Sequence, residues 1–326
     1  MLRIHFTAED LSRVRLAGAP DPLWETVLTL FRLRSRNTPL VFDGWRREAV
    51  GRSQRSALEM LMPLTPGGYF PDFLTPGEAA RGLEAGIDAV LSTGKERLQT
   101  EIGLLKMPNQ RPPTHIQALA RGDVESLHRL GAALREHHRT VVAPYWTEVE
   151  AQIEVDRLKR TRALLEGGCE GLLDSFRPNM RWSYPVLEAD FPADQDLYLE
   201  GRGLLLVPSY FSWNTPDALY DSSLSPVLVY PIQHDLKLTG KAPGQGSGES
   251  LSALIGATRA WILGAVDAGC TTSELARRVG VNPSSISQHT AVLRDAELIR
   301  TTRIGKSVMH TVTPLGRSLL EIKNPN

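Results

Sequence analysis

The chain has 326 residues, of which 41% are hydrophobic and 23% are charged, with 37 Lys/Arg balanced by 37 Asp/Glu. This length is sufficient for two domains, and the composition is that of a globular protein with a buried core. The sequence contains no run of about 18 apolar residues and no N-terminal apolar stretch with a basic flank. We therefore expect neither a membrane span nor a secretion signal, and the two cysteines favour a cytoplasmic protein.

The N-terminal part, residues 1–238, is predicted to be mainly helical. Apolar residues recur at helical spacing in the segments 22–34, 83–107 and 123–165. Pro144 should kink or divide the last of these, because proline has no backbone N–H and its ring clashes with the preceding turn. The sequence therefore predicts a bundle of helices in this part of the chain.

The pattern changes to strands near residues 180–232. Alternating or β-branched runs occur there at 182–188, 197–209 and 226–232. Ahead of the long helices, the Pro/Gly-rich segment 63–76 is typical of a loop that packs aromatic side chains. The expected fold class is mainly α with a small β component (α+β), with a small sheet near 180–232.

Five aromatic side chains of the sheet region are candidates for the wall of a small-molecule pocket. They are Trp182, Tyr184, Tyr210, Phe211 and Trp213. Aromatic residues line many ligand pockets, but the same residues are typical of the core of a small sheet. Both interpretations stay open, and the favoured function for this region is binding of an effector.

The N-terminal part shows no recognisable catalytic motif. We find no G-x-S-x-G elbow, no H-E-x-x-H, no Walker loop and no dinucleotide fingerprint, so we expect no enzyme and no cofactor. His137 and His138 are adjacent, and side chains at adjacent helical positions point about 100° apart, which favours a solvated or capping pair over a metal site. Catalytic groups can still converge from distant positions.

A flexible linker is predicted at residues 239–249, which contain four glycines and no apolar periodicity. Its Gly244-x-Gly246-x-Gly248 pattern lacks the strand and helix context of a phosphate loop. The linker separates residues 1–238 from 250–326. Residues 250–326 carry nine Lys/Arg and five Asp/Glu, a net charge of +4. The remaining 28 Lys/Arg and 32 Asp/Glu give residues 1–249 a net charge of −4.

The C-terminal part begins with a helix over 251–266, expected to bury Leu254, Ile255, Trp261, Ile262 and Ala265 and to touch a partner copy. A second helix should follow, capped by the side chain of Thr272 or Ser273 and ending at Gly280. Its apolar stripe consists of Leu275, Ala276 and Val279.

A third helix should begin at Pro283, because Asn282 is a good N-cap and proline suits the first helical position. The side chains expected to face the core are Ile286, Val292, Leu293 and Ala296. The outward side consists of Ser284, Ser285, Ser287, Gln288, Ala291 and Arg294. Small hydroxyls and an amide can approach base edges in the major groove of DNA, whereas acidic side chains would be repelled by phosphate.

A basic hairpin is predicted next, with strands over 298–303 and 307–313. Arg300, Arg303 and Lys306 give it positive charge, and such contacts with phosphate add affinity more than sequence preference. Helix, turn, helix and hairpin in this order are typical of a winged helix-turn-helix domain. The alternative is a small helical bundle with a solvated polar face.

The last 75 or so residues resemble the winged-helix domain of the ArsR family of bacterial repressors. The matching residues are Leu254-Ile255-Gly256-Ala257-Thr258-Arg259 with Ile262-Leu263, then Ser287-x-His289-x3-Leu293-x2-Ala296-x-Leu298-Ile299, then Gly305-Lys306. The resemblance implies that the third helix reads the major groove and that the hairpin is the wing. Thr290 stands where the family usually has Leu, and Glu297 stands where a Gly usually closes the helix.

The metal sites of the family's metal sensors are not expected here. Such a site needs several converging Cys, His or acidic ligands, and this chain has only Cys169 and Cys270, far apart in sequence. The N-terminal part resembles the uncharacterised region that precedes ArsR-like domains in some actinobacterial regulators, through Ile4-His5-Phe6-x3-Asp10-Leu11 and the run 201–209. That resemblance implies no ligand or activity.

The sequence therefore predicts a DNA-binding transcriptional regulator, a dimeric repressor whose N-terminal domain binds an effector or mediates dimerisation. The alternative is an enzyme or scaffold in the N-terminal domain, with the winged helix as a protein-interaction module. The polar, acid-free face of the third helix favours DNA, because apolar residues there would have favoured protein.

Overall fold

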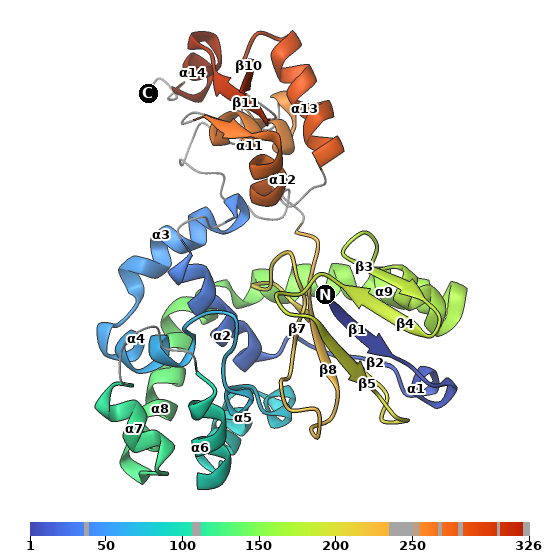
Figure 1. Ribbon diagram of the computed structural model, residues 1–326. Helices are drawn as coiled ribbons and strands as arrows, with labels where there is room; N and C mark the ends of the chain where they lie inside the picture. The colour runs from blue at the N-terminus through green and yellow to red at the C-terminus, as the bar shows by residue number, and fades with distance from the viewer. Residues whose placement is uncertain are drawn as a thin grey trace. The chain divides into compact units, whose positions relative to one another are not determined.

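The computed structural model describes residues 1–35, 39–105, 112–234, 251, 254–266, 269–279, 283–304 and 307–321. The chain divides into two compact units (Figure 1). Unit 1 comprises Met1–Arg34 and Gly51–Ile232, and unit 2 comprises Ser35–Val50 and Gln233–Asn326. Helix predominates over strand in both, which confirms the α+β fold class. The predicted linker lies outside the described residues.

The helical part of unit 1 surrounds α2 (Pro22–Arg34), in which every residue from Pro22 to Leu30 is buried. Asp21 caps this helix by accepting the backbone N–H groups of Leu23 at 2.9 Å and Trp24 at 3.0 Å. A helix that is buried on all sides is central to its domain. The other helices of this part are α1 (Ala8–Ser12), α4 (Arg55–Leu61), α5 (Leu83–Leu91), α6 (Lys95–Gly103), α7 (Thr114–Ala120) and α8 (Val124–His137).

The two long helical segments predicted from the sequence are each divided. The first breaks after α5, where the Ser92 N–H is bonded to the Asp88 carbonyl and α6 begins at Lys95. The second becomes α8, a π-helical turn (His138–Val142), a 3-10 turn (Ala143–Tyr145) and α9 (Trp146–Asp174). Pro144 lies in the 3-10 turn, which confirms the predicted division.

Unit 1 contains two four-stranded sheets instead of the single small sheet predicted at 180–232. The first has the order β3 (Met180–Ser183), β4 (Val186–Ala189), β1 (Leu2–His5), β5 (Gln195–Tyr198). The second has the order β2 (Arg15–Leu16), β6 (Leu205–Ser209), β8 (Val227–Pro231), β7 (Asp217–Ala218). The strands that the sequence did not predict, β1, β2 and β7, are two to four residues long. Of these, β1 pairs with a distant segment, with Leu2 opposite Ala189. Such short segments carry no usable alternation.

A buried charged network joins α9 to the second sheet. The Arg160 guanidinium contacts the Asp156 carboxylate at 3.0 Å and lies 4.3 Å from the centre of the Phe176 ring. The Tyr230 hydroxyl donates to the same carboxylate at 2.8 Å. Both charged side chains are buried, so each is stabilised by the other and by the surrounding hydrogen bonds.

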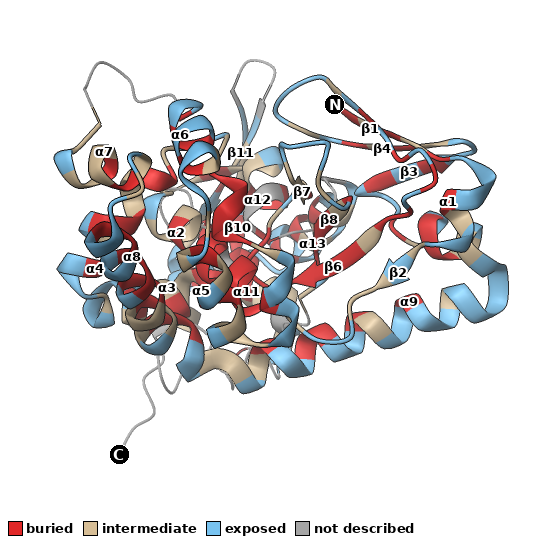
Figure 2. Cartoon of the chain, turned by 90° about the horizontal axis from the view of Figure 1, so that it is seen from below, coloured by how far each residue is buried: buried red, intermediate tan, exposed pale blue. Residues whose placement is uncertain are grey.

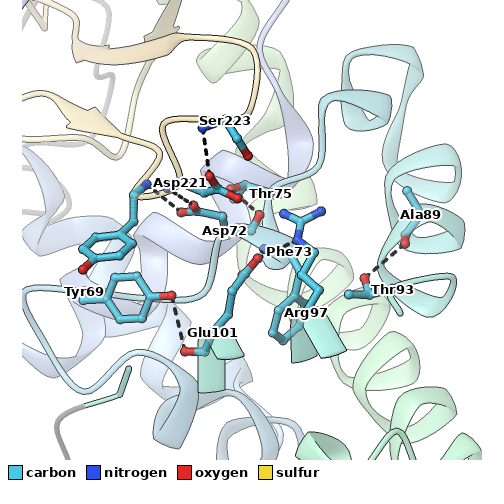
Figure 3. Close-up of polar contacts among 11 residues, drawn as sticks. Tyr69, Asp72, Phe73, Thr75, Ala89, Thr93, Arg97, Glu101, Asp221 and Ser223 are labelled. Carbon is cyan, nitrogen blue, oxygen red and sulfur yellow. Dashed lines mark hydrogen bonds and ion pairs between the residues drawn. The ribbon is translucent and has the colours of Figure 1, made fainter. Parts of the chain in front are cut away.

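The predicted aromatic loop ahead of α5 is fixed by two carboxylates (Figure 3). Asp72 accepts the backbone N–H groups of Tyr220 at 3.0 Å and Asp221 at 2.8 Å, and thereby ties the loop to a segment about 150 positions later in the chain. Glu101 accepts the backbone N–H of Phe73 at 2.8 Å. Phe73 is fully buried, so the loop does pack an aromatic side chain into the core.

His137 is not the solvated or capping residue that the sequence suggested. Its side chain is buried, and its Nε2 lies 2.9 Å from the Thr29 hydroxyl of α2. Burial, with a smaller contribution from His138, lowers the pKa of His137 to about 4. This histidine is therefore a neutral core residue that connects α8 to α2.

None of the described helices is long and apolar enough to cross a membrane.

Candidate nucleic-acid interface

Unit 2 contains the three helices and the hairpin predicted for the C-terminal part: α11 (Ala257–Ala265), α12 (Thr272–Val279), α13 (Pro283–Asp295), β10 (Ile299–Ile304) and β11 (Ser307–Val312). It also contains β9 (Cys270–Thr271) and α14 (Pro314–Glu321), which were not predicted. Two further elements of this unit come from the N-terminal part of the sequence: a 3-10 turn (Leu40–Phe42), which packs against α12, and most of α3 (Asp43–Arg52). The sequence predicts these residues to belong to the N-terminal domain, residues 1–238.

One hydrophobic cluster holds α11, α12 and α13 together. The predicted inward residues that are buried in it are Trp261, Ile262, Ala265, Leu275, Ala276, Val279, Ile286 and Leu293. Ile255 is partly buried against the same cluster. Leu254, by contrast, is 74% exposed, so its predicted inward position is wrong.

The inward face of α13 also differs from the prediction at two positions. Val292 is 44% exposed and Ala296 is exposed. The buried stripe instead runs through Ile286, Thr290 and Leu293, at the i, i+4, i+7 spacing of one helical face. Thr290, which stands where Leu is usual, satisfies its buried hydroxyl by donating to the Ile286 carbonyl at 2.9 Å.

The opposite face of α13 is polar and accessible. Ser284, Ser287, Gln288 and Arg294 are exposed, and Ser285 and Ala291 are partly exposed. Ser284, Gln288 and Ala291 are spaced i, i+4, i+7, which places them on one face of the helix, turned away from Ile286. No acidic residue occurs between Pro283 and Arg294, and the nearest one, Asp295, lies 3.5 Å from the Arg294 guanidinium.

The hairpin β10–β11 is antiparallel, with Arg300 opposite Thr311 and Arg303 opposite Val308. Both arginines are exposed. Because side chains alternate along a strand, positions 300 and 303 project from opposite faces of the hairpin. The third predicted basic residue, Lys306, lies outside the described residues. The two-residue strand β9 pairs with β11 and was not predicted, since it is too short for a sequence pattern.

A family model described as a helix-turn-helix domain matches residues 257–302. These residues form a helix-turn-helix domain. The match begins with α11 and ends within β10, so it covers both helices of the motif and the start of the hairpin. Comparisons with curated proteins and with solved structures give no match. Helix-turn-helix domains bind DNA, with the second helix of the motif in the major groove, and are typical of transcription regulators.

A buried histidine that was not predicted from the sequence connects α12 to the β10–β11 hairpin. His310 of β11 contacts the Thr272 hydroxyl through Nε2 and the Thr301 hydroxyl through Nδ1, each at 3.0 Å. Burial, and then Arg294, lower the pKa of His310. The cap of α12 also differs from the prediction. The Thr271 hydroxyl accepts the Glu274 N–H at 3.2 Å, whereas the Thr272 hydroxyl contacts His310. A single histidine in a strand gives no sequence signal for such a position.

The C-terminal end of α13 is closed by Glu297, at the position where glycine was expected from the sequence comparison. Glu297 has φ of 58°, the left-handed conformation that glycine adopts most easily. The Leu298 N–H reaches back to the Leu293 carbonyl at 2.9 Å, which is the closing hydrogen bond of a Schellman motif. The helix-turn-helix domain therefore keeps the usual geometry at this helix end with a residue that is strained there.

The five aromatic residues predicted as a pocket wall lie in two places. Trp182 and Tyr184 belong to the β3–β4 hairpin of the first sheet, with ring centres 6.2 Å apart. Tyr210, Phe211 and Trp213 follow β6 in the second sheet. Trp182, Tyr210 and Phe211 are buried, in agreement with the core interpretation. Trp213 is partly exposed and Tyr184 is exposed.

The segment after β6 is fixed by a buried carboxylate. Glu25 of α2 accepts the backbone N–H groups of Tyr210 at 2.8 Å and Phe211 at 3.0 Å, together with the Ser209 hydroxyl at 3.2 Å. Burial raises the pKa of Glu25 to about 7 against the effect of these hydrogen bonds. The backbone of Tyr210 and Phe211 is therefore anchored to α2 of the helical part.

A shallow surface hollow of about 540 Å³ is present elsewhere in unit 1. Its lining includes none of the five aromatic residues. The lining residues are Glu78, Arg81, Ala85, Asp88, Ala89 and Ser92.

Neither cysteine contributes to a cluster of metal ligands among the described residues. Cys270 is buried in unit 2, and the Cys169 thiol in unit 1 donates to the Leu11 carbonyl at 2.9 Å.

Proposed function

We propose that the protein is a sequence-specific transcriptional repressor that binds DNA as a homodimer and reads bases with α13. The observation that carries this proposal is the outward face of α13. It presents Ser284, Gln288 and Ala291 along one line, is free of acidic side chains, and lies opposite a stripe that is buried in the core. An exposed polar face on a rigidly packed second helix is what base recognition requires.

Each position on this face has a suitable chemistry. The Gln288 amide can both donate and accept, and such an amide pairs with the N6 and N7 atoms of adenine in the major groove. Ser284 and Ser287 can bond to bases or to phosphate, and Ala291 is small enough to let the backbone approach a thymine methyl group. We therefore assign base recognition to Gln288 first, with the serines and Ala291 around it.

Phosphate contacts are assigned to the wing and to the end of α13. Arg300 and Arg303 are exposed and project from opposite faces of the hairpin, so they can engage phosphates at different places. Arg294 of α13 is exposed as well, and Lys306, which lies outside the described residues, is expected from the sequence to add a further positive charge. These contacts position the protein and add affinity without selecting a sequence.

Dimerisation and repression rest on the resemblance to the ArsR family and on the symmetry of DNA sites. A dimer reads two half-sites about one helical turn apart, so a change in the spacing of its reading helices changes affinity. We propose that unit 1 regulates this spacing by binding an effector and has no catalytic role. An effector that binds the two conformations unequally shifts DNA affinity by linkage.

The test is a salt titration of binding to a duplex of arbitrary sequence, followed by fluorescence anisotropy. The wild type should show a steep decrease of log K with log salt concentration. Arg300→Ala and Arg303→Ala should each reduce the slope by about 0.9, because each removes one phosphate contact. The matched control is Arg55→Ala in unit 1, whose side chain is 93% exposed. Equal slopes for all four proteins would refute the proposed wing contacts.

A further inference from the structure

Unit 2 includes a segment that comes from near the start of the sequence, between two parts of unit 1. The chain passes from one unit to the other at 34/35, at 50/51 and at 232/233. The second passage falls inside α3, which is one helix from Asp43 to Arg52. The predicted linker is therefore not the only covalent connection between the units.

The described part of this segment, residues 39–50, has a buried apolar side, and we call it the docking segment. Phe42 is fully buried, and Trp45 and Ala49 are 4% and 1% exposed. Their spacing of three and four residues places them on one helical face. Val50 is 62% exposed, so the segment has both a buried and an exposed side (Figure 2).

Aromatic contacts connect the docking segment to the part of unit 2 that begins at Gln233. The Phe42 ring centre lies 6.5 Å from that of Trp45 and 5.1 Å from that of His234. Both pairs are close to perpendicular, at 75° and 89°, which is a favourable edge-to-face arrangement. Phe42 therefore links the docking segment to the second stretch of chain that enters this unit.

The docking segment also lies against the first helix of the helix-turn-helix motif. Its 3-10 turn packs against α12. This helix packs in turn on α13, and its Thr272 contacts His310 of the hairpin. The matched family model begins at residue 257, so the docking segment is an addition to the helix-turn-helix domain. It is placed at the helix on which both the reading helix and the hairpin rest.

We propose that the docking segment controls the affinity for DNA. When it is docked, it holds α12 in the binding conformation, and its displacement by a change in unit 1 weakens binding. The segment continues the chain from α2 and leads into α4, so a shift of either helix acts on it directly. This inference rests on the proposed function and deepens it by naming the route of regulation.

The coupling between docking and DNA binding should be reciprocal. Both favour the same conformation of α12, so each strengthens the other by linkage. Couplings of this kind change an affinity by about 5–150-fold. A segment that only fills space beside α12 would show no such coupling to DNA.

Cleavage of the linker tests the docking in the full-length chain. A recognition sequence for a site-specific protease is inserted within residues 239–249, and the cleaved protein is analysed by size-exclusion chromatography. The two fragments should elute together. With Phe42→Ala they should separate, whereas Val50→Ala, at the exposed side of the same segment, should leave them together.

Two results of the cleavage experiment would overturn the proposal. Separation of the cleaved wild-type fragments would do so without any substitution, and so independently of the stability of a variant. Fragments that stay together equally in all three proteins would do so as well, because the docking segment would then not be what holds them.

DNA binding by the uncleaved proteins separates control of affinity from passive packing. Phe42→Ala should lower the affinity for a duplex of arbitrary sequence by about fivefold or more. The slope of log K against log salt concentration should stay unchanged, because no phosphate contact is removed. Val50→Ala should bind like the wild type. An unchanged affinity for Phe42→Ala would overturn the proposal.

Hydrogen exchange followed by mass spectrometry checks where Phe42→Ala acts. Exchange should be faster in α12 and unchanged in α5 of unit 1, which also shows that unit 1 of the variant is folded. Exchange in α12 that matches the wild type would contradict the docking on this helix.

Failure of the docking segment and failure of the proposed function give different results. If the wild type binds DNA with a wing-dependent salt slope but Phe42→Ala binds equally well, the control by the docking segment is refuted and the DNA-binding function stands. If Arg300→Ala and Arg303→Ala leave DNA binding unchanged while Phe42→Ala separates the cleaved fragments, the docking stands and the proposed wing contacts are refuted.

Discussion

Unit 1 and unit 2 bury different kinds of side chain. Among the described residues of unit 2, the buried polar side chains are Thr290 and His310, and the charged side chains proposed to contact DNA, Arg294, Arg300 and Arg303, are exposed. Unit 1 buries charged groups, including Glu25, Asp156 and Arg160, as connections between segments far apart in the chain. The side chains of α13 that face away from the core of unit 2 follow a regular helical spacing, whereas these buried charged side chains of unit 1 connect segments that are distant in sequence.

The largest expected effect tests whether the buried charges of unit 1 are structural. Arg160→Ala leaves the Asp156 carboxylate buried without its cation, and should lower the free energy of unfolding of unit 1 by about 3–5 kcal/mol. Arg162→Ala, on the exposed side of the same helix, removes only a surface pair with Glu166 and should cost less than about 1 kcal/mol. Urea unfolding followed by circular dichroism measures both. Similar losses for the two variants would contradict this difference.

The next prediction concerns the pH dependence of unit 1. His137 has a pKa of about 4 in the folded chain and 6.5 when unperturbed. As the pH falls from 6.5 towards 4, the unfolded chain takes up a proton that the folded chain excludes, so His137 reduces stability over this range. His137→Gln removes the titration and keeps a group that can reach Thr29.

Relative to its value at pH 8, the stability of His137→Gln compared with wild type should rise by about 2 kcal/mol at pH 5. The raised pKa of Glu25 acts in both proteins and cancels in the difference. Thermal unfolding at the two pH values provides the measurement. A difference that does not change with pH would show that His137 does not stay neutral in the folded core.

The smallest effect belongs to unit 2, where a local conformational strain should be removable. Glu297→Gly should stabilise the helix-turn-helix domain by about 0.5–1 kcal/mol, because glycine adopts a φ of 58° without steric cost. Ala296→Gly, one residue earlier and exposed, should instead destabilise it by up to about 1 kcal/mol. Thermal scans of both variants check the sign. Destabilisation by Glu297→Gly would mean that the glutamate side chain makes a compensating contact.

The sequence predicted α12, α13 and the β10–β11 hairpin of unit 2 well because these elements have local signals. Residues close in the chain are sufficient to predict the start of α13 at Pro283 and the basic hairpin. They also predict the core positions Leu275, Ile286 and Leu293. The errors at Val292 and Ala296 arose because a polar residue, Thr290, occupies the buried stripe. Hydrophobicity alone could not show that its hydroxyl bonds back to the helix.

Unit 1 was predicted less completely for a physical reason. Its helices and the break at Pro144 follow from periodicity, but its sheets are assembled from short strands near residues 2–16 and 180–232. Long-range pairs of this kind leave no mark in a local window. The bonds from Asp72 and Glu25 to distant backbone N–H groups are equally invisible in the sequence, since a carboxylate in an amphipathic helix or loop is usually solvated.

The most direct test of the central claim is selection of bound duplexes from a random-sequence pool by the full-length wild type and Gln288→Ala, at two salt concentrations. The account predicts that the wild type enriches a two-fold-symmetric site with half-sites about 10 base pairs apart. Gln288→Ala should lose about 1–3 kcal/mol on that site and relax the preference at one position of each half-site. No enrichment by the wild type at either salt concentration would contradict base recognition by α13.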